Sequence, residues 1–170
     1  MNWHVLFVLG GHEHKIKDKI NESHHDAFIP KVTKLFKRKD ELRKEDVPLF
    51  KNYVFVKSKS NTIEFQEYIQ HEIQHMTGFI KLLKHDNEGT ESLYPHEKEF
   101  LMKFANKDHV INQSQGFIEG DKIVITEGPL IGHESLIRKI DRHKRIAQLD
   151  IEMFGDKRTI TVGLEIISKR

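Results

Sequence analysis

The sequence contains no cysteine. This absence excludes disulfide bonds, thiolate zinc sites and cysteine nucleophiles, none of which a cytoplasmic protein needs. There is also no run of about eighteen apolar residues, the length that would cross a membrane, and the N-terminus lacks the small-residue cleavage site of a signal peptide. We therefore expect a cytoplasmic protein with no membrane partner.

Signatures of common catalytic sites are also missing. The sequence offers no activated serine, no P-loop and no constellation of paired carboxylates. We therefore expect a protein that is not an enzyme, with no catalytic residue, no metal site and no cofactor.

One motif does match an enzyme signature, because residues 71–75 read HEIQH. In zinc proteases two helical histidines of this pattern bind the metal and the glutamate acts as base. With 12 histidines in the chain, such a match is weak evidence. The apolar positions Phe65, Ile69 and Ile73 lie on the other side of the expected helix, which places both histidines in solvent. A zinc hydrolase stays as the alternative from another class.

Charge is nearly balanced overall, with a formal net charge of +2, but it is unevenly distributed. Residues 31–44 hold 7 Lys and Arg against 2 acidic residues, and residues 138–145 hold 5 against 1. Such blocks can face phosphates, although a solvated loop is the ordinary interpretation.

The first part of the chain alternates between strand and helix patterns, which predicts a compact α+β domain. Short β-prone runs predict strands at residues 3–9, 53–56 and 77–83. Apolar residues at four-residue spacing predict helices at residues 12–23 and 62–72, and Pro95 opens a third helix after a polar loop at 85–92.

The last part of the chain has the pattern of an all-β domain. Helical periodicity is lost over residues 105–116, where we place the domain boundary. Strand patterns follow at residues 122–125, 135–140, 147–153 and 159–167, joined by glycine-containing turns. About five short strands in such a segment fit a small barrel better than an open sheet.

Three stretches in this order resemble the NusG family of transcription factors. WHVLFVLGGHE at residues 3–13 resembles the family's opening, and PLFKNYVFV at 48–56 resembles its PLFPGYVFV signature. Residues 120–155 resemble a KOW motif, with GPL, Gly132 and a closing Phe-Gly. The resemblance implies an NGN-type α/β sandwich at 1–108, a linker at 109–116 and a five-stranded, SH3-like KOW barrel at 117–170.

The resemblance also implies partners for the N-terminal domain. In the family this domain docks on the clamp of RNA polymerase, which assigns polymerase binding to Tyr53, Phe55 and Phe79; core packing is the alternative for all three. The non-template DNA strand is a further candidate partner. However, QHMTGF at 74–79 lacks the family's polar pair and proline there, which favours antitermination over pausing.

The basic turn between the strand patterns at 135–140 and 147–153 most resembles the LoaP subfamily, the operon-specific antiterminators. Basic turns can follow phosphates, and arginine reads guanine edges. We therefore expect a monomer whose KOW domain binds a structured RNA hairpin through Arg138, Lys139, Arg142, His143, Lys144 and Arg145. The alternative is a general elongation factor whose KOW domain recruits a ribosomal protein or a termination factor.

Overall fold

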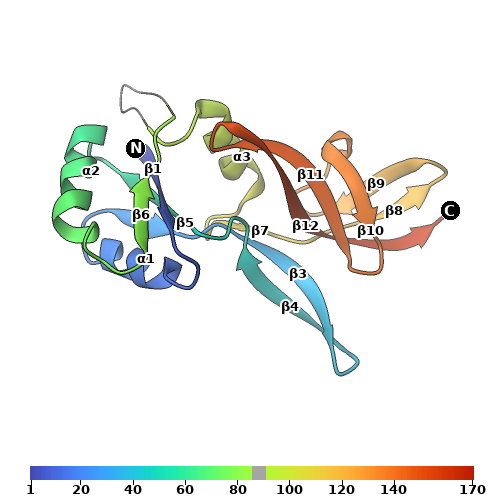
Figure 1. The fold of residues 1–170 in the computed structure, drawn as a ribbon. Helices are drawn as coiled ribbons and strands as arrows, with labels where there is room; N and C mark the ends of the chain where they lie inside the picture. Colours follow the sequence, from blue (N-terminus) through green and yellow to red (C-terminus); the bar gives the residue numbers. More distant parts are fainter. Residues whose placement is uncertain (86–90) are drawn as a thin grey trace. The chain divides into compact units, whose positions relative to one another are not determined.

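Four strands form an antiparallel sheet near the N-terminus, in the order β2–β5–β1–β6 (Figure 1). The computed structural model describes residues 1–85 and 91–170. The strands are β1 (Asn2–Val8), β2 (Asp26–Phe28), β5 (Tyr53–Ser58) and β6 (Phe79–Leu82). The three strands expected in this region are confirmed. Most of the polar loop expected at 85–92 lies outside the described residues.

Helices cover one face of this sheet. They are α1 (Glu13–Asn21) and α2 (Thr62–Tyr68), the latter continued by the π-helical turn η1 (Ile69–Ile73). The expected apolar stripes are confirmed, because all their members are buried in one core with alternate residues of β1 and β5: Ile16, Ile20, Phe65, Ile69, Ile73, Leu6, Val8, Val54 and Val56. A third helix, α3 (Pro95–Phe104), begins at Pro95 as expected.

The molecule divides into two units. The first contains Met1–Ile29, Phe50–Glu99 and Met153–Asp156, and the second contains Pro30–Leu49, Phe100–Glu152 and Lys157–Arg170. None of the helices among the described residues is long and apolar enough to span a membrane.

The first basic block forms a β-hairpin, so its interpretation as a solvated loop is wrong. Strand β3 (Lys31–Arg38) pairs with β4 (Glu41–Pro48) along its whole length. The turn residues Lys39 and Asp40 have φ angles of 48° and 65°, the left-handed pair of a type I′ hairpin turn. The many charged side chains obscure the strand pattern in the sequence. Cross-strand contacts join the two strands, among them the Arg38–Glu45 ion pair at 3.3 Å and the Thr33–Asp46 hydrogen bond at 2.6 Å.

Five strands form the sheet of the second unit, in the order β10–β11–β12–β8–β9. They are β8 (Ser114–Glu119), β9 (Lys122–Glu127), β10 (Ile137–Asp141), β11 (Ile146–Met153) and β12 (Asp156–Lys169). Within β11, Ala147, Leu149 and Met153 are buried, and Ile151 of the same alternating set is half-buried. The strand order is open, and over residues 1–85 and 91–170 no pairing of β9 with β10 closes a barrel. The expected closed barrel is therefore not observed. Alternation in the sequence predicts which face of a sheet a residue occupies, but it does not predict which strands pair.

Residues 109–116, expected as a linker, contain β7 (Val110–Ile111) and the start of β8. Strand β7 pairs in parallel with β3. Strand β12 also approaches β3 closely at Gly163, where a Cβ atom would lie 2.4 Å from the carbonyl oxygen of Thr33. Only glycine permits this approach.

Candidate functional site

An aromatic row lies on the face of the first sheet that α1 and α2 leave uncovered. Residues along a strand alternate between faces, so Phe7 and Tyr53, which are paired between β1 and β5, point away from the helix-side core. Their ring centroids are 5.3 Å apart. The ring of Phe154 stacks on Tyr53 with 4.2 Å between centroids. We call Phe7, Tyr53 and Phe154 the aromatic row; all three are partly exposed.

The three residues assigned to polymerase binding do not share one surface. Phe55 is fully buried and packs near Phe28 and Phe50, with ring centroids 5.7 Å and 6.1 Å away. Phe79 pairs with Val8 and packs against the helix-side core, so it lies on the face opposite Tyr53. Tyr53 and Phe55 therefore share one face of β5, where Tyr53 is partly exposed and Phe55 is buried, and Phe79 lies on the other face.

Sequence reasoning missed the other two members of the aromatic row. Phe7 follows Val5 by two positions on β1, so the alternation of that strand carried a usable signal. Phe154 comes from the turn between β11 and β12, about a hundred residues from Tyr53 in sequence, and no local pattern relates the two.

The loop before Tyr53 is held by a carboxylate. Asn52 has a φ of 74°, the left-handed conformation that asparagine tolerates better than most residues, which explains how it replaces the glycine of the family signature. The Glu13 side chain accepts N–H bonds from Asn52 at 3.3 Å and from Gly11 at 2.9 Å. The Val8 N–H donates to the Asn52 carbonyl at 2.9 Å. These bonds fix the end of β1 against the start of β5, where Phe7 and Tyr53 lie.

The second basic block forms a tight hairpin turn between β10 and β11, as expected. The Asp141 carboxylate accepts the backbone N–H of Lys144 at 2.9 Å, and this bond lowers the pKa of Asp141. Arg145 has a φ of 56° and closes the turn. The side chains of Lys139, Arg142, His143 and Lys144 are exposed, and Arg145 is half-buried. The turn itself thus presents three exposed basic side chains, those of Arg142, His143 and Lys144, and Lys139 lies just before it on β10.

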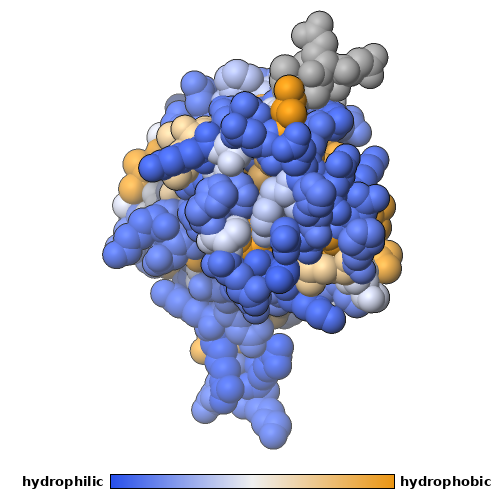
Figure 2. Space-filling model, turned by 90° about the vertical axis from the view of Figure 1, so that its left-hand side faces the viewer, coloured by the Kyte–Doolittle hydropathy of each residue, from blue (hydrophilic) through white to orange (hydrophobic). Residues whose placement is uncertain are grey.

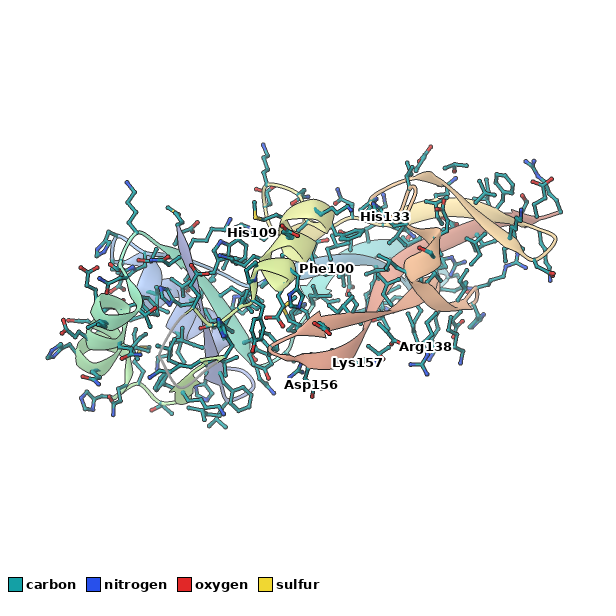
Figure 3. All side chains as sticks on the ribbon, turned by 90° about the horizontal axis from the view of Figure 1, so that it is seen from above. Phe100, His109, His133, Arg138, Asp156 and Lys157 are labelled. Carbon is teal, nitrogen blue, oxygen red and sulfur yellow. The ribbon has the colours of Figure 1, made fainter. Side chains whose placement is uncertain are left out.

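Arg138 differs from the other residues assigned to RNA binding. It lies on β10 in the second unit (Figure 3), and its guanidinium donates to both carboxylate oxygens of Asp150 at 3.3 Å. The Thr159 hydroxyl donates to the same carboxylate at 2.8 Å, and these bonds lower the pKa of Asp150. The structure therefore engages Arg138 in an exposed ion pair.

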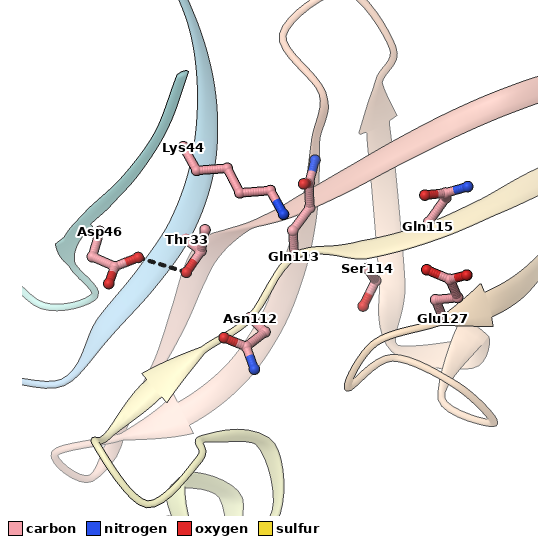
Figure 4. A pocket seen from close by; sticks show the side chains of 8 residues that line it. All are labelled: Thr33, Lys44, Asp46, Asn112, Gln113, Ser114, Gln115 and Glu127. Atoms are coloured by element: carbon pink, nitrogen blue, oxygen red, sulfur yellow. Dashed lines mark hydrogen bonds between the residues drawn. The ribbon is translucent and has the colours of Figure 1, made fainter. Parts of the chain in front are cut away.

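A polar pocket of about 480 Å³ lies elsewhere in the second unit (Figure 4). Within it the Thr33 hydroxyl donates to Asp46 at 2.6 Å, and the Lys44 and Gln113 side chains point toward one another. The lining contains one lysine and two carboxylates. It consists of Thr33, Lys44, Asp46, Asn112, Gln113, Ser114, Gln115 and Glu127. This pocket lacks the positive excess that a nucleic-acid backbone requires.

The HEIQH segment lies on the solvent side, as expected. His71 and His75 are exposed, whereas Ile69 and Ile73 are buried. The Gln74 N–H donates to the Ile69 carbonyl at 2.8 Å, the i to i+5 bond of a π-turn. Most of the surface in Figure 2 is hydrophilic. In the part of the chain that the structure describes, no three His, Asp or Glu side chains gather to hold a metal ion.

The structure thus presents a row of aromatic rings in one unit and a basic turn in the other. The family model of the transcription termination factor NusG matches residues 1–114 of the 170, and the chain belongs to the NusG family. No curated protein matches the sequence. NusG factors are non-enzymatic transcription proteins that act in elongation or antitermination and bind RNA polymerase.

Proposed function

We propose that this chain is an operon-specific processive antiterminator of the LoaP kind. Its NGN domain at residues 1–108 docks on the clamp of RNA polymerase. Its KOW domain at 117–170, tethered by residues 109–116, binds a hairpin in the nascent RNA. The two contacts together hold the factor on polymerase at selected operons.

The aromatic row supports polymerase docking. Partly exposed aromatic rings supply much apolar area with few degrees of freedom, and such rings are common anchors of protein interfaces. Tyr53 is the anchor of this proposal, because it is partly exposed and the stacked ring of Phe154 orients it. Phe79 contributes through packing on the other face.

The turn at residues 142–145 carries the RNA-binding part of the proposal. Its exposed cations lie at the end of a β-hairpin, where the Asp141 bond fixes the backbone. A backbone that is already fixed does not have to be ordered on binding, which reduces the entropy that binding costs. Arg142 and Arg145 are the candidates for reading base edges, and Lys144 is the candidate for a phosphate contact.

A general elongation factor is the second candidate, since the matching family model is that of a termination factor. In that case the KOW domain would recruit a ribosomal protein or a termination factor in place of RNA. The two candidates differ in the ligand of residues 117–170 and share the docking of the NGN domain.

The test is binding of the full-length protein to hairpin RNA, measured by fluorescence anisotropy over a range of salt concentrations. Lys144→Gln should weaken binding to all RNAs alike and lower the salt slope by about one unit. Arg142→Gln should reduce discrimination between RNA sequences. Lys15→Gln, an exposed lysine on α1, is the matched control. Tight binding of a ribosomal protein with no RNA binding at low salt would favour the general factor.

A further inference from the structure

A groove of about 440 Å³ in the second unit joins the two basic blocks of the sequence. One wall is the β3 strand and the other is the basic turn with the first residue of β11. The lining consists of Lys34, Leu35, Phe36, Lys37, His143, Lys144, Arg145 and Ile146. We call this the basic groove. Blocks that are about a hundred residues apart in sequence thus form one surface.

The lining of the basic groove combines positive charge with apolar side chains. Lysine, arginine and histidine supply five of the eight residues, and none of the eight is acidic. Leu35, Phe36 and Ile146 supply the apolar part, and all three are half-buried. Among the residues that the structure describes, no other aromatic ring stacks on Phe36. Positive walls around an unstacked ring are the combination with which proteins hold unpaired nucleic acid.

Both walls are fastened to the same strand. The Lys34 ammonium donates to the Thr161 hydroxyl on β12 at 2.5 Å. On the other wall, the carbonyl of Arg145 accepts the backbone N–H of Leu164, also on β12, at 3.0 Å. Strand β12 therefore holds the hairpin and the basic turn at a fixed separation, so the groove exists before any ligand binds.

We propose that the basic groove binds an unpaired stretch of RNA, with a base stacked on Phe36 and phosphates between the β3 lysines and the basic turn. This inference rests on the proposed function, because the groove shares His143, Lys144 and Arg145 with the turn that binds the RNA hairpin. The turn contacts the paired stem, and the groove takes the unpaired loop or flank that continues from it. Positive charge alone would also attract an acidic peptide, and stacking of a base on Phe36 is what would distinguish RNA from it.

The test compares affinities of the full-length protein for a short uridine homopolymer, the same sequence as DNA, and polyglutamate. Phe36→Leu keeps the apolar contact and removes the stacking face, so it should lower RNA affinity at least about fivefold without changing the salt slope. Lys37→Gln should lower the salt slope by about one unit. Leu42→Ala and Lys39→Gln are the matched controls, since both residues are exposed on the same hairpin outside the groove.

Phe36→Tyr keeps the ring and should bind RNA like wild type. Because it changes the same position, it separates the loss of the stacking face from a general effect of substituting Phe36. Photocrosslinking of halogenated uridine RNA to the wild-type protein should label the peptide that contains Phe36. Unchanged RNA binding by Phe36→Leu, or equal effects of Lys37→Gln and Lys39→Gln, would overturn the groove while leaving the hairpin-binding turn intact. Preference for DNA or polyglutamate would overturn it as an RNA site. Loss of sequence discrimination on hairpin RNA by Arg142→Gln, at a turn position outside the groove lining, is measured separately and reports on the proposed function alone.

Discussion

The ring of Tyr53 lies almost flat on the ring of Phe154, with 4.2 Å between centroids and 22° between planes. Phe154 also approaches Phe50 and Phe55, at 5.3 Å and 5.8 Å. The backbone N–H of Gly155 donates to the buried Glu97 carboxylate at 2.8 Å, which fixes this turn in the first unit. Tyr53 is therefore oriented by a residue about a hundred positions later in the chain, in the turn between β11 and β12.

This stacking predicts an energetic coupling. The free energy of unfolding should be measured for Tyr53→Ala, Phe154→Ala and the double variant. The double-mutant cycle should return a coupling of about 0.5–1.5 kcal/mol, the range for aromatic pairs beyond their burial. Phe7→Ala with Phe117→Ala is the control pair, because these rings lie in different units. Additive effects for Tyr53 and Phe154 would contradict the stacked geometry.

The docking role of the aromatic row predicts different outcomes for two neighbours on β5. Tyr53→Ala should weaken binding to RNA polymerase by about 1–3 kcal/mol while the domain stays folded. Phe55→Ala should instead destabilise the fold by about 3–5 kcal/mol, because it empties a fully buried site. Polymerase affinity and thermal unfolding of both variants provide the measurement. Normal polymerase binding by Tyr53→Ala would place the docking surface elsewhere.

The exposed histidines of HEIQH predict a silent double variant. His71→Ala with His75→Ala removes no buried contact. The free energy of unfolding should therefore stay near the wild-type value, and transcriptional activity should stay within a few-fold of wild type. Metal analysis of untagged protein should find no stoichiometric zinc. Zinc that is present in the wild type and lost in the double variant would revive the hydrolase interpretation.

Two substitutions of Asp141 that remove the same negative charge should have different effects on RNA affinity. Asp141→Asn removes a negative charge beside the RNA-binding cations but keeps an oxygen that can accept the Lys144 N–H, so RNA affinity should rise. Asp141→Ala removes the same charge and also the bond at 2.9 Å that orders the turn, so it should bind RNA more weakly than Asp141→Asn. Anisotropy with hairpin RNA measures both. Equal affinities would mean that charge alone governs binding.

Features of the fold that depend on residues close in sequence were predicted, whereas features that depend on residues far apart in sequence were not. The stripes Ile16–Ile20 and Phe65–Ile69–Ile73 predicted the helices and their buried faces, because helical periodicity is local. The β3–β4 hairpin was missed, since its stability comes from cross-strand partners that the sequence does not pair. The separation of Tyr53 and Phe79 onto opposite faces follows from strand register, which the sequence does not specify for β6.

The basic groove illustrates the same limit at the site. Both basic blocks were evident in the sequence as runs of Lys and Arg. Residues of the second block were assigned to RNA binding, whereas those of the first block were given no role. Phe36 and Lys144 line the same groove because β3 and the basic turn are both hydrogen-bonded to β12. This long-range arrangement has no local signature in the sequence.

Burial of His4 predicts a loss of stability in acid. The ring stacks on Phe65 at 4.0 Å and is 1% exposed, and burial lowers its pKa from 6.5 to about 4. The neutral ring is therefore favoured in the folded state: its contribution is fully present above pH 6.5 and is lost as pH falls toward 4. Burial lowers the pKa of His25 as well, which acts in the same direction.

The size of the His4 effect follows from the shift. The loss should approach about 3 kcal/mol, since each pKa unit corresponds to about 1.4 kcal/mol. Urea unfolding measured between neutral pH and pH 4 should show it. His4→Leu should flatten this pH dependence, whereas His24→Gln, at an exposed position, should not. A wild-type profile that matches His4→Leu would contradict this origin.

The parallel pairing of β8 with β12 has a consequence for how the chain is made. Ser114 lies opposite Leu164, so β8 leaves the ribosome about 50 residues before its partner does. At about 5–20 residues per second, β8 waits roughly 3–10 seconds for that partner. Phe154 is synthesised in the same late interval and reaches Tyr53 only then. During that interval the nascent chain exposes an unpaired strand edge and an uncovered tyrosine, both of which are open to misassembly.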